Sequence, residues 1–328
     1  MNLRVQTQLT RLNWRRAIEV SILRDGHNAV PRTLVGYVAQ LVVLGGSLYF
    51  LTACPESAPH SDRASRAPST RTLRDTASAA LEGVFDVGGH KLYLKCEGTG
   101  SPTVVYLHGL IVTRGGSQSS GLIPGYLRDL VRVCVYDRAN VGFSDTVPGP
   151  ITGQDAVKDL HQLLEAANVR GPYVLLGGSF GGLIAVMYAA TYPEDVTGMV
   201  LLDASLPDDV INIDERFLPL EARMKADDWK RNRELMDLLT TFRQAHAIQR
   251  VGTKIPLTYI ATTTVDLDPS WPVEQMTTAI RANQRAFVDS FTPGRLLLLK
   301  DVPHFMERAI PQTVADEVGR VIAIISAR

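Results

Sequence analysis

The sequence lacks the patterns that usually indicate a metal site, a nucleotide site or a nucleic-acid partner. Its 328 residues hold three cysteines, with no C-x-x-C pair, no H-E-x-x-H and no acidic calcium loop. We therefore predict no metal and no cofactor. The glycine-rich run that starts at Gly115 is not followed by Lys-Ser or Lys-Thr, which excludes a P-loop. Lys+Arg and Asp+Glu are 34 each, so no net charge favours binding to nucleic acid.

The N-terminal segment has the composition of a targeting or anchoring sequence. Residues 1–32 are polar and rich in arginine, whereas residues 34–53 are apolar and carry no charge. About twenty residues at about 1.5 Å each are long enough to span a bilayer core of about 30 Å. The run ends in Leu51-Thr52-Ala53-Cys54, which resembles a bacterial lipoprotein box and implies cleavage before Cys54 and lipidation of its thiol.

The alternative to a lipoprotein is an uncleaved anchor helix, and a third interpretation is a cytoplasmic segment. The first two place the rest of the chain in the cell envelope outside the cytoplasm, bound to the membrane or else secreted. We interpret 1–54 as a signal or anchor segment. Residues 55–80 are rich in Pro, Ser, Ala and Arg and poor in large apolar residues, which predicts a flexible linker. The globular domain is predicted over 81–328.

One stretch of this domain carries the strongest local signal. The apolar run from Tyr173 to Leu176 predicts a buried strand, and the apolar residues 183–190 predict a buried helix. Between them lies Gly177-Gly178-Ser179-Phe180-Gly181, a G-x-S-x-G sequence in the strand–turn–helix context of a nucleophile elbow. We interpret its glycines as follows: Gly177 and Gly181 allow close backbone packing, and Gly178 and Gly182 add conformational freedom.

Strand and helix patterns alternate around this stretch. An opening hairpin around Gly88-Gly89 is followed by strand–helix units, which predicts an α/β fold with a mostly parallel sheet and helices on both faces. Expected strands are 84–87, 91–96, 103–107, 131–136, 173–176, 199–202, 257–261 and 295–299. Expected helices are 155–167, 182–191, 272–289 and 311–326. The polar, helix-favouring residues 206–252 form an insert between the sixth and seventh strands.

From about residue 82 onward, the chain resembles an α/β-hydrolase. His108-Gly109 lies just after the third strand, where that family has its oxyanion loop, and residues 136–145 (YDRANVGFSD) resemble its loop after the fourth strand. Asn140 stands where the family usually has glycine; asparagine tolerates a positive φ, so the turn can be kept. The resemblance implies a helical cap over 206–252. Its apolar stripe favours a partly apolar small-molecule substrate.

The resemblance also implies a catalytic triad. Ser179 is the expected nucleophile, and His304, which follows the last strand, is the expected general base. Two regions offer the acid. Asp203 directly follows the sixth strand, and we favour it; Asp266 and Asp268 lie in the loop after the seventh strand and remain alternatives. The backbone N–H groups of Phe180 and Leu110 are the expected oxyanion donors.

These residues predict a serine hydrolase that cleaves an ester-type bond, with a carboxylic ester favoured. Thioesterase, lactonase, aminopeptidase and C–C hydrolase activities are alternatives, and so is a non-catalytic, anchored binding protein on the same fold. Dehalogenases and epoxide hydrolases of the family need an aspartate where Ser179 stands. In this family the second and fourth strands are neighbours, so Cys96 and Cys134 are expected to form a disulfide in an oxidising envelope.

Overall fold

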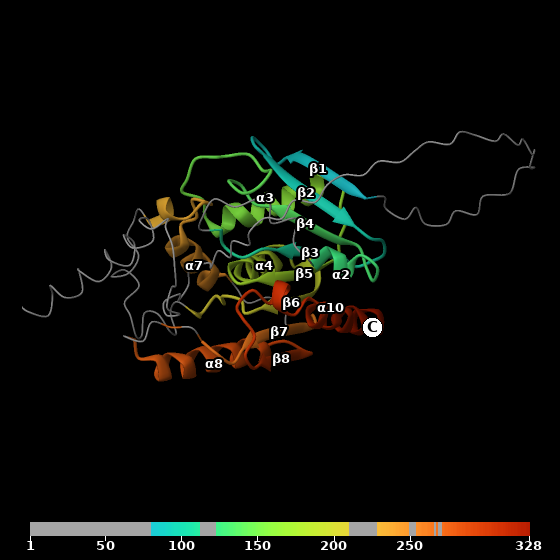
Figure 1. The fold of residues 1–328 in the computed structure, drawn as a ribbon. Helices are drawn as coiled ribbons and strands as arrows, with labels where there is room; N and C mark the ends of the chain where they lie inside the picture. Colours follow the sequence, from blue (N-terminus) through green and yellow to red (C-terminus); the bar gives the residue numbers. More distant parts are fainter. Residues whose placement is uncertain (1–79, 112–122, 210–227, 249–253, 266, 268–270) are drawn as a thin grey trace, which may run out of the picture. The chain divides into compact units, whose positions relative to one another are not determined.

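The structure is a computed structural model that describes residues 80–111, 123–209, 228–248, 254–265, 267 and 271–328. The expected anchor segment and linker, with Cys54, therefore lie outside the described residues. Their assignment, and the domain boundaries drawn from it, stay predictions. The described part of the chain contains one sheet with helices around it (Figure 1).

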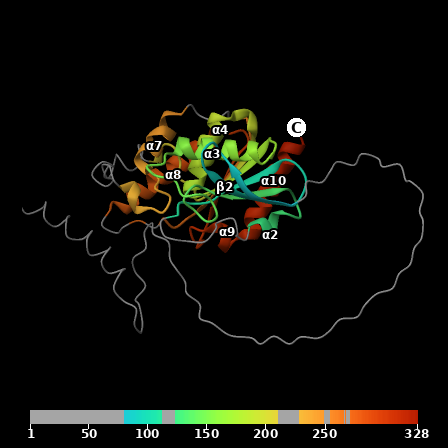
Figure 2. The same cartoon turned by 90° about the horizontal axis from the view of Figure 1, so that it is seen from above.

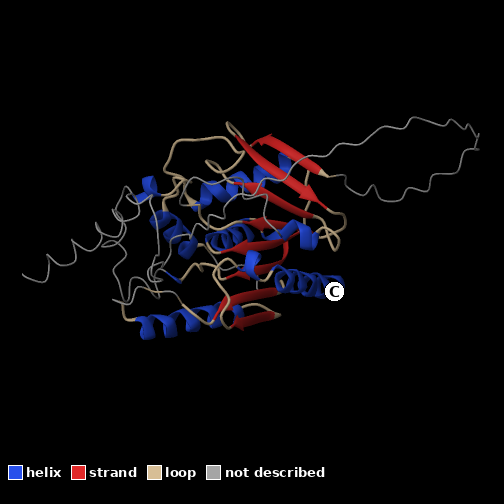
Figure 3. Cartoon of the chain, viewed as in Figure 1, coloured by secondary structure: helices blue, strands red, loops and turns tan. Residues whose placement is uncertain are grey.

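The sheet has eight strands in the order β1-β2-β4-β3-β5-β6-β7-β8. Strand β2 is antiparallel to β1 and to β4, and every other neighbouring pair is parallel (Figure 3). The expected mostly parallel sheet with an antiparallel N-terminal hairpin is thus confirmed. The strands are β1 (Leu81–Asp86), β2 (Lys91–Glu97), β3 (Thr103–Leu107), β4 (Val133–Asp137), β5 (Tyr173–Gly178), β6 (Val196–Leu202), β7 (Leu257–Thr262) and β8 (Gly294–Leu299).

Helices cover both faces of the sheet, as Figure 2 shows for α3 and α4 on one side and α2, α9 and α10 on the other. The helices are α2 (Ile123–Leu127), α3 (Gly153–Ala166), α4 (Phe180–Thr191), α7 (Leu238–Ala247), α8 (Val273–Asp289), α9 (Met306–Ala309) and α10 (Pro311–Ser326), with short 3-10 helices η2 (Pro193–Asp195) and η4 (Asp228–Arg231). Each face has its own hydrophobic core.

The central strands are apolar because helices cover both faces of the sheet. Along β3, Val105 and Leu107 belong to the core beneath α3 and α4, whereas Val104 and Tyr106 belong to the core beneath α2 and α10. Successive side chains of a strand point to opposite faces, so a strand buried on both faces favours apolar residues at successive positions and not only at alternate ones. This is why the central strands are continuous apolar runs rather than alternating ones.

Of the insert between β6 and β7, residues 206–209 and 228–248 are described, and its central part, 210–227, lies outside the described residues. Helix α7 packs on α3, where the Gly153 N–H donates to Thr241 Oγ1 over 2.8 Å. The described end of the insert is therefore attached to the body of the domain. Among the described residues, no helix is long and apolar enough to cross a membrane.

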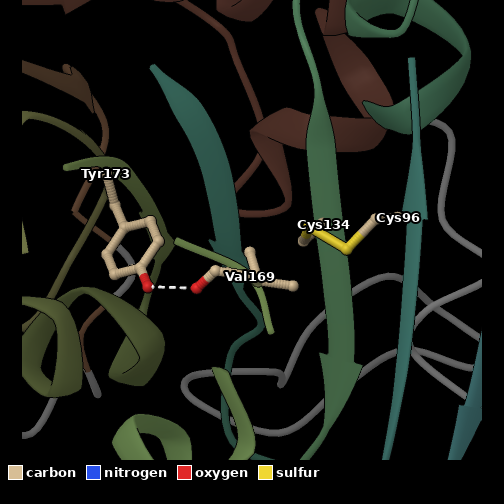
Figure 4. Close-up of a disulfide and its surroundings, with 4 residues drawn as sticks. All are labelled: Cys96, Cys134, Val169 and Tyr173. Carbon is tan, nitrogen blue, oxygen red and sulfur yellow. Dashed lines mark hydrogen bonds between the residues drawn. A yellow bond between two sulfur atoms is a disulfide. The ribbon is translucent and has the colours of Figure 1, made fainter. Parts of the chain in front are cut away.

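A disulfide joins Cys96 on β2 to Cys134 on β4 (Figure 4). The two residues are directly opposed in the antiparallel pairing of these strands, with their Cα atoms 4.0 Å apart. Both side chains are buried. The bond links positions 38 residues apart, so it restricts the unfolded chain more than a local bond would.

We predict that the chain carrying Cys54→Ser shows no reactive thiol when it is denatured without reductant, and two after reduction. Titration with a thiol reagent measures both values. Removing the bridge by a Cys96→Ala, Cys134→Ala double substitution should lower the free energy of unfolding by about 4 kcal/mol, measured by denaturant titration. Two reactive thiols before reduction would contradict the bridge.

Candidate active site

Ser179 occupies a sharp turn between β5 and α4. Its backbone has φ 52° and ψ −125°, a conformation that is strained for a residue with a side chain. Two hydrogen bonds to the neighbouring strand end hold it. The Ser179 N–H donates to the Leu202 carbonyl over 2.9 Å, and the Ser205 N–H donates to the Ser179 carbonyl over 3.1 Å. The surroundings thus fix a turn that is unfavourable in isolation.

The glycines around Ser179 mainly provide space. A Cβ at Gly181 would lie 2.2 Å from the Leu107 carbonyl oxygen, and one at Gly177 would lie 2.6 Å from the Gly182 Cα. Our interpretation of Gly182 was wrong: its φ is not positive, and a Cβ there would lie 2.2 Å from the Ala204 Cβ. Gly178 also has no positive φ, and its nearest neighbour would lie at an ordinary 3.7 Å.

His304 and Asp203 meet at the carboxyl end of the sheet. His304 Nδ1 lies 2.7 Å from Asp203 Oδ2. Asp203 directly follows β6, has φ 39°, and donates its backbone N–H to the Ile260 carbonyl over 2.7 Å. Because the Leu202 carbonyl binds the Ser179 N–H, the acid–histidine pair and the serine lie at the same edge. If Asp203 accepts the Nδ1 proton, the role of base falls to Nε2.

The other described histidine–acid pairs lie elsewhere in the fold. Side-chain contacts join His90 to Asp159, His161 to Asp195 and His246 to Asp208. In none of these pairs does the acid directly follow the last residue of a strand, as Asp203 does. His108 is buried beside the loop after β3, and burial together with the Arg138 charge places its pKa well below the usual value. A neutral, buried His108 fits the structural role expected for it.

Burial and charge act in opposite directions on His304. Burial by itself lowers the pKa, but the Asp203 hydrogen bond and the charges of Asp203 and Glu307 outweigh it, so the pKa of His304 is raised. Glu307, three residues further on, is mostly buried, and burial raises its own pKa. A Cβ on Gly178 would lie 4.0 Å from Glu307 Oε2. A second carboxyl group therefore lies next to the nucleophile turn, and no sequence motif indicated it.

The expected oxyanion donors lie on either side of this turn. Phe180 is the first residue of α4, where a backbone N–H has no acceptor within its own helix. Leu110 follows Gly109, and a Cβ on Gly109 would lie 3.3 Å from the Ser179 Cβ. The loop after β3 thus passes directly beside the serine. Their catalytic roles stay predictions.

Two buried charged residues that our sequence reasoning did not select contact this loop. Arg138 Nε donates to Glu234 Oε2 over 2.6 Å, and both side chains are almost fully buried. Asn140, two residues after Arg138, has φ 68°, the positive value expected where an asparagine replaces the usual glycine. The replacement of glycine by Asn140 is the sequence signal that could have drawn attention to Arg138, because both residues lie in the same turn.

Some expected residues cannot be placed. The alternative acids Asp266 and Asp268, the run from Gly115, and the apolar residues of the insert between 217 and 224 lie outside the described residues. The hydrogen bond to His304 favours Asp203 over these alternatives. Among the described residues no group of three His, Cys, Asp or Glu side chains could hold a metal ion.

Comparison with known proteins supports the same fold. A family model described as the alpha/beta hydrolase fold matches residues 102–235. The protein YqjL of Bacillus subtilis is 31% identical over 134 residues, which cover 40% of this chain and 51% of that protein. Cis-3-alkyl-4-alkyloxetan-2-one decarboxylase of Shewanella oneidensis is 32% identical over 126 residues, which cover 37% of this chain and 38% of that protein. The matched stretches thus span about half or less of these relatives.

Among solved structures, the epoxide hydrolase VrEH1 of Vigna radiata superimposes with a TM-score of 0.57 at 13% identity, covering 75% of this chain and 98% of that one. At this identity the likeness shows the fold alone. The chain therefore has the α/β-hydrolase fold, and the match of the family model to residues 102–235 agrees with it.

We predict that Asp203→Asn lowers turnover far more than Asp266→Asn. The carboxylate of Asp203 would hold the required tautomer of His304 and stabilise its charged form, and an amide of the same shape cannot. Steady-state kinetics of the two purified variants on an ester substrate measures the difference. The opposite ranking would move the acid to the loop after β7.

We predict that Glu307→Gln moves the acidic limb of the kcat/KM pH profile to lower pH. His304 must be neutral to accept a proton, and the Glu307 charge helps to raise the pKa of His304. Without that charge, the imidazole stays neutral to lower pH. The matched control is Asp316→Asn, an exposed acid on α10, which should leave the profile unchanged. An unchanged or upward-shifted limb in Glu307→Gln would contradict the prediction.

Proposed function

We propose that the protein is a serine hydrolase that cleaves a carboxylic ester through an acyl-enzyme. The observation that carries the proposal is the 2.7 Å contact of His304 with Asp203 at the sheet edge where Ser179 occupies its strained turn. A serine hydroxyl is a poor nucleophile until an oriented base removes its proton. An acid–histidine pair at the same sheet edge as a partly exposed turn serine is the arrangement that meets this need.

In the first half of the reaction, Ser179 Oγ attacks the ester carbonyl carbon while His304 Nε2 takes the hydroxyl proton. The electron pair of the carbonyl moves to its oxygen, where the N–H groups of Phe180 and Leu110 stabilise the negative charge. When the intermediate collapses, the bond to the alcohol oxygen breaks. His304 then returns its proton to the leaving alcohol, and the acyl group stays on Ser179.

In the second half, water replaces the alcohol. His304 takes a proton from the water, whose oxygen attacks the acyl carbon, and the same two N–H groups stabilise the new oxyanion. Collapse releases the carboxylic acid and returns the proton to Ser179. Throughout, Asp203 keeps the Nδ1 proton of His304 in place, so the imidazolium is stabilised without a change of its position.

The substrate class needs a test of its own, because proteins on this fold perform different reactions. The Shewanella relative is named for a decarboxylation of an oxetan-2-one, which is a four-membered cyclic ester. A first substrate panel therefore contains open-chain p-nitrophenyl esters of increasing acyl length, a thioester, a lactone and an aminoacyl amide. The ranking of kcat/KM within this panel tests the substrate class.

Location is a further part of the proposal. A disulfide between β2 and β4 supports an oxidising compartment, and the run that ends at Cys54 favours membrane attachment. The thiol titration described above, applied to the chain with its natural Cys54, distinguishes a lipidated Cys54 from a free one. A lipidated Cys54 adds no thiol to the count, whereas a free one adds one.

We predict that Ser179→Ala and His304→Ala each lower kcat by about 10⁴–10⁶-fold, and that the double variant is little worse, because the two groups act as one unit. A fluorophosphonate probe should label the native chain, with the adduct on Ser179 by peptide mass mapping. Absence of both labelling and turnover would favour a non-catalytic binding protein. Retention of most activity in Ser179→Ala would refute the assignment of the nucleophile.

A further inference from the structure

The ion pair between Arg138 and Glu234 is the most deeply buried one among the described residues, with side chains 4% and 1% exposed. Burying two charges costs free energy unless hydrogen bonds satisfy them completely. Burial by itself lowers the pKa of Arg138, but the Glu234 charge and hydrogen bonds outweigh it and the pKa is raised. Arg138 therefore stays charged, and its five N–H donors need acceptors.

The Glu234 carboxylate accepts from Nε and Nη2, and the loop after β3 supplies further acceptors. Arg138 Nη1 donates to the His108 carbonyl over 2.8 Å, and Nη2 donates to the Gly109 carbonyl over 2.9 Å. The Glu234 carboxylate accepts the Ile111 N–H over 2.7 Å. The pair thus binds the loop both before and after Leu110.

These contacts fix the direction of one particular N–H group. The Gly109 carbonyl and the Leu110 N–H belong to one planar trans peptide, in which they point in opposite directions. Because the Gly109 carbonyl points to Arg138, the Leu110 N–H points away from it. The Arg138 guanidinium also lies over the Phe180 ring, 5.7 Å from its centre. One side chain therefore contacts Phe180 and also the Gly109 carbonyl of the peptide that carries the Leu110 N–H.

Glu234 belongs to the insert between β6 and β7, and backbone contacts keep this part of the insert against the body. The Arg233 N–H donates to the Ile111 carbonyl over 3.0 Å, and Asn140 Nδ2 donates to the Glu234 carbonyl over 3.2 Å. The Ile151 N–H donates to the Leu235 carbonyl over 2.9 Å. The insert therefore contributes a charged group to the support of the loop beside Ser179.

We propose that Arg138 and Glu234 are positioning residues that hold the Leu110 N–H toward the oxyanion formed at Ser179, so that the insert completes the oxyanion hole. The inference rests on the proposed serine-hydrolase function. An oxyanion donor is effective because it is oriented before charge develops, and the charge is present mainly in the transition state. Loss of orientation should therefore lower kcat and leave KM nearly unchanged.

The test uses Glu234→Gln, which keeps the shape and removes the charge, and Arg138→Lys, which keeps the charge and loses the fork geometry. In each we expect kcat to fall about 10- to 100-fold with KM within about threefold, since a misdirected donor costs less than the 10²–10³-fold loss for a donor removed. The rate constant of fluorophosphonate labelling should fall in parallel, because negative charge also develops on the phosphoryl oxygen when Ser179 Oγ displaces fluoride from phosphorus.

The matched control is Glu317→Gln. Glu317 is a buried carboxylate on α10 that binds Arg320 and Arg295 through 2.8 and 3.2 Å contacts, and it does not contact the loop after β3. This variant should lose stability, seen as a lower Tm, but keep its kcat. A similar loss of kcat in Glu317→Gln would mean that any buried acid does the same, and would overturn the proposal.

The remaining outcomes are also decisive. A folded Glu234→Gln or Arg138→Lys with kcat within about twofold of the native value would overturn the positioning role. Failure of both variants to fold, judged by circular dichroism while Glu317→Gln folds, would show a purely structural pair and overturn it as well. A native chain that neither turns over esters nor is labelled at Ser179 would instead refute the proposed function. This outcome is measured on the native protein, without any variant, so it is distinct from the outcomes above.

Discussion

The structure of the site depends on how closely the first turn of α4 approaches the ends of β3 and β6. At Gly181 no room exists for a side chain against the Leu107 carbonyl, and at Gly182 none exists against Ala204. This contact keeps Ser179 at φ 52°, because the strand before it and the helix after it are both fixed by packing. The same contact brings three strand ends together. As a result, residues distant in sequence can act on one substrate atom.

Much of this arrangement could be predicted from local sequence signals. The apolar runs are long enough to mark β3, β5 and β7, since a strand buried on both faces is mostly apolar, here with threonine as the exception at positions 103, 258 and 262. His304 and Asp203 were found because each follows such a run. The boundaries were less certain: α4 begins at Phe180 rather than at Gly182, because glycines that suggest a turn are here inside the first helical turn.

The support of the site could not be predicted, because it depends on pairing between distant residues. Arg138 and Glu234 are 96 residues apart, and Glu234 lies in an insert where most residues are polar. No local pattern selects one of the 34 acidic residues as the partner of a buried arginine. Glu307 is similar: its proximity to Gly178 follows from how α9 packs, and α9 is too short to give a periodic signal.

Asn140 links the turn after β4 to the insert between β6 and β7. Where the family usually has a glycine, this asparagine keeps the turn by adopting φ 68°. Its side chain then does what a glycine cannot, since Nδ2 donates to the Glu234 carbonyl and Oδ1 accepts the Val147 N–H. A substitution that a sequence motif treats as a tolerated exception is therefore part of the contact between insert and body. The turn after β4 and the insert therefore depend on each other. Asn140 in the turn binds the Glu234 carbonyl of the insert, and the Glu234 carboxylate binds Arg138 in the turn.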